Sequence, residues 1–94
     1  MKQSVYAEVV ERDEGACVDC KKAGGLLHHV VPKSMLMGRR KKERDQPKNL
    51  VVLCILCDAM AHTKTARRRH LTLLREKHDY QYPDQPWLGL LGEA

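Results

Sequence analysis

Four cysteines form two pairs with the same short spacing. In each pair, Cys17 with Cys20 and Cys54 with Cys57, two residues separate the thiols. A turn of this length can aim two thiolates at one ion, and two such turns complete a tetrahedral site. Thiolates in this geometry favour Zn²⁺. We therefore predict a structural zinc site that is coordinatively closed, so that catalysis must come from elsewhere. The alternatives are four free thiols, two disulfides or a thioredoxin-like redox pair.

Two adjacent histidines, His28 and His29, lie in an apolar stretch that ends at Pro32. Burial of both would be costly unless each has a polar partner. If the stretch is a strand, the two side chains point to opposite sides. One imidazole could then bind a metal ion while the other moves a proton, a role for which imidazole is well suited.

Asp58 and His62 are four residues apart in a segment with a helical pattern, so we expect them on one helix face. A carboxylate oxygen and an imidazole nitrogen at this spacing can chelate a divalent ion. With His28 they would form a three-residue site that leaves positions open for water and phosphate. The alternatives are a helix N-cap for Asp58 and a surface position for His62.

The pattern of apolar and turn residues predicts the elements that must position these groups. Residues 26–31 and 50–53 are short apolar runs next to turn residues, which is typical of strands. The polar and basic residues 33–48 between them predict a long structureless connection, which in a compact domain tends to be functional or mobile. Residues 3–12 fit either a short strand or a first helical turn.

The second half of the chain favours helix. Asp58 is expected to open the helical segment, which has one or two pieces with a break near residues 63–65. His70 and His78 are expected at the surface of this segment. Residues 80–94 contain two prolines and predict an irregular tail. The tail is expected to pack back through Trp87, Leu88, Leu90 and Leu91.

Size and charge limit the classes of function. The 94 residues, with no Phe and one Trp, predict one domain with a thin core that benefits from a metal. The formal net charge of +5 suits a polyanion such as nucleic acid. The basic residues expected to contact backbone phosphates, unless they are only solvated faces, are Arg39, Arg40, Lys41, Lys42, Arg67, Arg68 and Arg69.

Hydropathy predicts a location inside the cell. No apolar run approaches the roughly 20 residues of a membrane span, so no membrane partner is expected. The first ten residues lack the apolar stretch and cleavage site of a signal peptide. An intracellular, cytoplasmic protein would keep its thiols reduced, which favours metal binding over disulfides.

The order of these motifs resembles the HNH endonuclease family. Over residues 17–64, about half the chain, Cys-x2-Cys is followed by His-His-Val-Val-Pro, then Asn-Leu-Val-Val-Leu-Cys-x2-Cys, and then a His four residues after Asp58. The resemblance implies a small α+β fold with a ββα-metal (His-Me finger) nuclease core over about residues 15–66. A helical extension and tail would follow over about residues 67–94.

The resemblance also implies a role for each site residue. His28 and His62 match metal ligands, and His29 matches the general base that activates water. Asn49 matches the asparagine that ties the long loop and so steadies the base. Asp58 departs from the His or Asn of many relatives, and its hard oxygen favours Mg²⁺ or Mn²⁺ as the catalytic ion, with Ni²⁺ or Zn²⁺ as alternatives.

The implied reaction is metal-dependent hydrolysis of DNA, with duplex DNA as the first expectation. The products would carry 5′-phosphate and 3′-hydroxyl ends. The chain could act alone, as a homodimer or in a larger DNA-processing complex. It also resembles short HNH proteins that phages often encode, which suggests phage DNA processing in the host cytoplasm. The rival hypotheses are a catalytically inert zinc-knuckle module that binds nucleic acid, and a protein-interaction subunit of a DNA-processing complex.

Overall fold

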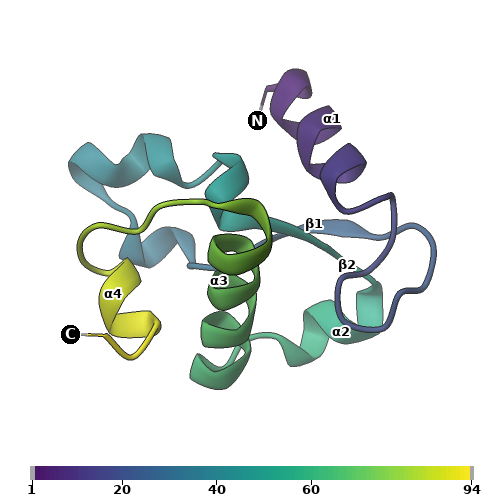
Figure 1. Ribbon diagram of the computed structural model, residues 1–94. Helices are drawn as coiled ribbons and strands as arrows, with labels where there is room; N and C mark the ends of the chain where they lie inside the picture. The colour runs from purple at the N-terminus through teal and green to yellow at the C-terminus, as the bar shows by residue number, and fades with distance from the viewer. Residues whose placement is uncertain (1, 94) are drawn as a thin grey trace.

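The computed structural model describes residues 2–93, without the side chain of Arg39, as a two-stranded antiparallel sheet surrounded by helices (Figure 1). The α+β class predicted from the sequence is therefore confirmed. Within residues 2–93 no helix is both long and apolar enough to cross a bilayer. The helices and strands are α1 (Gln3–Arg12), β1 (Leu26–His29), β2 (Leu50–Leu53), α2 (Ile55–Met60), α3 (Lys64–His78) and α4 (Trp87–Leu90).

The two strands pair so that their apolar residues serve two faces. His28 lies opposite Val51 and His29 opposite Leu50. Side chains alternate along a strand, so Leu50 and its second neighbour pack on α1, while Val51 and Leu53 join the larger core with α3. The strand predicted over residues 50–53 is confirmed, and the one predicted over residues 26–31 ends two residues early. The pairing continues beyond that end, since Val30 N–H donates to the Asn49 carbonyl.

Residues 3–12, which the sequence left open between strand and helical turn, form α1. Val9 is the buried residue of this helix and packs against Leu50 and Val52. At its end, the Arg12 guanidinium donates to the carbonyls of Pro47 and Leu50. The helix is thereby fixed on one face of the sheet, on the side of β2 (Figure 1).

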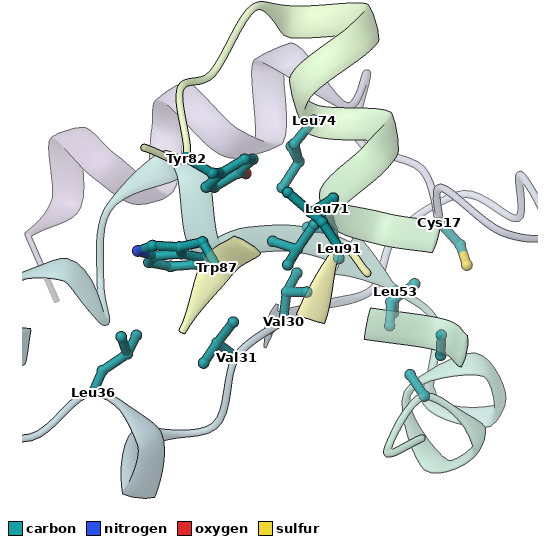
Figure 2. Packing of buried hydrophobic residues seen from close by; sticks show 13 residues of the cluster. Cys17, Val30, Val31, Leu36, Leu53, Leu71, Leu74, Tyr82, Trp87 and Leu91 are labelled. Atoms are coloured by element: carbon teal, nitrogen blue, oxygen red, sulfur yellow. The ribbon is translucent and has the colours of Figure 1, made fainter. Parts of the chain in front are cut away.

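The main core lies on the other face of the sheet and includes the C-terminal tail (Figure 2). The indole of Trp87 is fully buried, and its ring centroid lies 5.1 Å from that of Tyr82. The prediction that the tail packs back is confirmed, because Trp87 and Leu91 are both buried. The tail is not wholly irregular, since α4 provides one short helix within it.

The connection between the strands is ordered, which corrects the prediction of a structureless segment. It contains three 3-10 helices, η1 (Lys33–Met35), η2 (Gly38–Glu43) and η3 (Pro47–Asn49). Leu36 is fully buried and anchors the connection in the core, and the Arg44 Nε donates to its carbonyl at 2.6 Å. One apolar side chain with a backbone tie therefore organises a segment that is otherwise polar and basic.

The helical segment breaks once, as one of the predicted forms requires, but at residues 61–63 rather than 63–65. The helix α2 begins before Asp58, and its N-cap is Cys54, whose thiol accepts from the Cys57 N–H. Thr63 caps α3 by accepting from the Ala66 N–H. Because α2 ends at Met60, the expectation that Asp58 and His62 share one helix face is wrong.

Candidate functional site

The four predicted zinc ligands lie together. The sulfur atoms of Cys17, Cys20, Cys54 and Cys57 are all within 4.8 Å of one another, and all four cysteines are free. The first pair lies before β1 and the second pair joins β2 to α2, so the strand pairing brings them to one end of the sheet. The prediction of a four-cysteine cluster compatible with a structural metal such as zinc is confirmed.

Backbone donors prepare this cluster for a cation. The Cys20 N–H donates to the Cys17 sulfur at 3.5 Å, and the Cys57 N–H donates to the Cys54 sulfur at 3.4 Å. Burial raises the pKa of the Cys17 thiol, but these donors outweigh it and bring that pKa down to about 6. The Cys57 N–H likewise lowers the pKa of Cys54. Thiolates are the form that binds metal, so the folded turns favour the ligand state.

His28 pairs with Asp58 across the junction of β1 and α2. The His28 side chain is 5% exposed, and its Nδ1 lies 2.9 Å from Asp58 Oδ1. Burial lowers the pKa of His28 and outweighs the opposite effect of Asp58. A neutral imidazole next to a carboxylate is therefore present here, and both are donors that divalent cations accept.

A cleft of about 250 Å³ brings five predicted functional residues together. His62 lies in the link between α2 and α3, and its ring centroid is 5.5 Å from that of His28. Among residues 2–93, the four cysteines are the one group of three or more potential ligands whose atoms all lie within 4.8 Å of one another. The pair of His28 and Asp58 is thus preformed, whereas His62 stands farther off. The cleft is lined by Leu27, His28, His29, Val30, Pro32, Asp58, His62 and Arg67.

His29 contacts a carboxylate that sequence reasoning missed. Its Nε2 lies 2.7 Å from Oδ1 of Asp45, in the connection between the strands. A carboxylate accepts, so Nε2 carries the proton and a neutral His29 has its lone pair on Nδ1. The hydrogen bond from His29 lowers the pKa of Asp45, which keeps the carboxylate charged. No motif marked Asp45, because its partner is distant in sequence.

Asn49 ties the connection to the end of β1. It is fully buried, and its Oδ1 accepts from the Val31 N–H at 2.8 Å. Its Nδ2 donates to the carbonyls of Val31 at 3.2 Å and Arg44 at 3.0 Å. Arg44 precedes Asp45 directly, so these bonds fix the backbone beside the carboxylate that holds His29. Such contacts are what the predicted loop-tying role requires.

His70 is buried, which corrects its predicted surface position. Its side chain is 1% exposed, and its Nε2 lies 3.0 and 3.1 Å from the two carboxylate oxygens of Asp19. The neighbouring arginines suggested an exposed helix face, but Ala66, His70 and Leu74 are spaced by four residues and form the inner face of α3. That spacing was the signal available in the sequence.

The predicted phosphate-contacting residues differ in their surroundings. Arg67 lines the cleft, while Arg68, Lys41 and Lys42 are exposed. Arg69 pairs with Asp19 at 3.0 Å, and Arg40 pairs with Glu43 and Asp84. The side chain of Arg39 lies outside the described part of the chain. The structure therefore places Arg67, of the two basic runs, next to the histidines.

Comparison with protein-family models, with curated proteins and with solved structures gives no match to this chain. The chemistry of the cleft is therefore inferred from its own groups. It offers a neutral imidazole beside a carboxylate, a second imidazole held by another carboxylate, and a guanidinium. These groups could hold a divalent cation, accept a proton from water and bind a phosphate.

Proposed function

We propose that this chain is a metal-dependent endonuclease of the HNH type that hydrolyses phosphodiester bonds in DNA. The observation that carries the proposal is the cleft in which the pair of His28 and Asp58 lies beside the pair of His29 and Asp45. A hairpin of β1 and β2 followed by α2 is also the order of elements that the ββα-metal resemblance implies. The basic net charge agrees with a DNA substrate.

The residues of the cleft fit a divalent cation held by His28 and Asp58, with His62 as a third ligand. Nδ1 and Oδ1 already lie 2.9 Å apart, a separation that two ligands of one ion can have. His62 is exposed on a link between helices, so its ring is free to turn toward the pair. A bound Mg²⁺ or Mn²⁺ would supply charge neutralisation at the phosphate and at the leaving oxygen.

His29 acts as the general base in this proposal. Asp45 accepts from Nε2, so the free lone pair on Nδ1 takes the proton from the attacking water. Asn49 keeps the backbone before Asp45 in place, and Asp45 keeps the ring oriented. The base is therefore positioned by a chain of contacts that starts in the buried interior.

Arg67 binds the phosphate next to the reacting bond. It lines the same cleft as His28 and His29, and it is half-buried on the first turn of α3. A guanidinium in this position offers two parallel N–H donors to phosphate oxygens. The exposed cations Arg68, Lys41 and Lys42 would add contacts to the DNA backbone that weaken as salt increases.

A second candidate is a zinc-stapled DNA-binding module without catalytic activity. The observation that favours it is that, of residues 2–93, only the four cysteines gather three or more ligand atoms within 4.8 Å. This module would still use Arg67 and the exposed cations. It leaves the buried contacts of Asn49 and the pairing of His29 with Asp45 without a purpose.

The test is cleavage of supercoiled plasmid by the zinc-loaded protein in buffer freed of other metals. We expect nicked or linear DNA on addition of Mg²⁺ or Mn²⁺, and a reaction that stops when the cation is omitted. EDTA followed by zinc alone is the control that separates loss of the structural metal from loss of the catalytic one. A wild-type protein that retards DNA on a gel but leaves it intact with every cation, Ni²⁺ included, would support the second candidate.

Loss of the partner of His29 should slow cleavage without weakening DNA binding. In Asp45→Asn, the amide no longer provides a charged acceptor, so we expect the rate at saturating DNA to fall on the order of 10-fold through misorientation of the ring. KM should stay near the wild-type value. The matched control is Glu93→Gln, which removes the same charge at an exposed pair with Arg75. Equal rates in the two variants would rule out an orienting role for Asp45.

A further inference from the structure

Two buried imidazole nitrogens near the cleft have no hydrogen-bond partner among residues 2–93. They are His28 Nε2 and His70 Nδ1. The two ring centroids lie 6.1 Å apart, with the ring planes inclined by 66°. A buried polar nitrogen without a partner destabilises the fold, so each of these nitrogens calls for an explanation.

The remaining nitrogen of each ring is already assigned. His28 Nδ1 faces Asp58, and His70 Nε2 donates to Asp19. A carboxylate acts only as an acceptor when ionised, and the pKa of Asp19 is below its ordinary value because the contributions of His70 and Arg69 outweigh burial. A neutral His70 therefore carries its proton on Nε2, and its buried Nδ1 is an acceptor. Only the position of the proton on His28 is left to be decided.

We propose that His70 is a positioning residue that fixes His28 in the tautomer able to bind the catalytic cation. This inference rests on the proposed function. A neutral imidazole has one N–H, and a cation held with Asp58 needs the lone pair of His28 Nδ1. The proton must then lie on Nε2, and His70 Nδ1 is the nearby acceptor. Metal-binding histidines almost always donate their second N–H to such a partner.

The chain of contacts joins the two metal centres. It runs from Asp58 through His28 and His70 to Asp19, which lies between Cys17 and Cys20. In the cation-free protein the His28 proton lies on Nδ1 and donates to Asp58. Cation binding moves that proton to Nε2, so both orphaned nitrogens gain a partner in the same event. The four-cysteine turn thus anchors the orientation of the catalytic ligand.

Two substitutions at position 70 separate positioning from a merely structural role. His70→Asn places an oxygen near the position of Nδ1, so it keeps the acceptor for His28 and loses the donor to Asp19. His70→Gln keeps the donor to Asp19 and loses the acceptor for His28. The probe is Mn²⁺, titrated into zinc-loaded protein by calorimetry. We expect His70→Gln to lose affinity by about 10- to 100-fold and His70→Asn to lose clearly less.

The reverse order, with His70→Gln near the wild type, would show that His70 only supports the fold and would overturn the inference. His78→Gln on the same helix is the control for loss of a histidine, and zinc content with circular dichroism reports folding of each variant. If both position-70 variants misfold, the wild type still decides by ¹⁵N NMR. Addition of Mg²⁺ should move the His28 proton from Nδ1 to Nε2, and a proton that stays on Nδ1 overturns the inference.

Failure of the inference differs from failure of the proposed function. A wild type that binds Mn²⁺ and cuts plasmid, while His70→Gln binds Mn²⁺ equally well, overturns the positioning role alone. A wild type that binds neither Mn²⁺ nor Mg²⁺ and leaves DNA intact overturns both.

Discussion

Replacement of Cys20 by Ser should leave the protein unable to hold zinc and largely unfolded at room temperature. Cys20 is exposed, so the substitution removes a ligand without opening a cavity in the core. Binding of zinc by four such ligands supplies on the order of 10 kcal/mol of folding free energy. Small domains have total stabilities of about 5–15 kcal/mol, so loss of most of this contribution is enough to unfold the chain.

The measurements for Cys20→Ser are zinc content by atomic absorption and thermal unfolding by circular dichroism. Lys22→Ser is the matched control, because it alters an exposed side chain in the same turn and leaves the thiols intact. Removal of zinc from the wild type by a chelator should give the same unfolded spectrum, and added zinc should restore the folded one. A zinc-free variant that melts cooperatively at the wild-type temperature would contradict a structural role for the metal.

His29→Ala should lower the rate of plasmid cleavage by about 10²- to 10⁴-fold, the usual contribution of a general base. His29 lies at the surface end of β1 and is half-buried, so its truncation should disturb packing little. Affinity for DNA, measured on a gel, should remain unchanged. The separation of rate from affinity is the feature that a purely binding role cannot produce.

Two additions sharpen the His29 experiment. Imidazole in the buffer should partly restore cleavage by His29→Ala, because it can accept the proton in place of the missing ring. His78→Ala, on the last turn of α3, should cleave at the wild-type rate. Retention of cleavage within about threefold in His29→Ala would remove this residue from the mechanism and leave the cation site to be reassigned.

The parts of the molecule that sequence predicted well are those with local causes. Two-residue spacing holds the thiols of Cys54 and Cys57 in one turn, so their cluster with the other pair was predictable. The strand over residues 50–53 is an apolar run next to Asn49, and its ends match the structure. In both cases the decisive physics acts within a few residues of the chain.

The parts that sequence missed depend on contacts between distant segments. Asp45 meets His29 only because Leu36 and Asn49 fold the connection back over the strand. The bend between α2 and α3 carries His62 away from the helix of Asp58, and local helix propensity does not report such a bend. The burial of His70 depends on Asp19, which arrives from the four-cysteine turn.

The tail covers the connection between the strands, and this sets an order of events during synthesis. The Tyr82 hydroxyl donates to the carbonyl of Lys48, and the Lys48 ammonium lies 5.0 Å from the centroid of the Trp87 ring. Lys48 directly precedes Asn49. A nascent chain that has already made both strands still lacks these two covering residues. The cleft is therefore completed only after the chain has grown past Trp87, which delays cutting activity until most of the domain has left the ribosome.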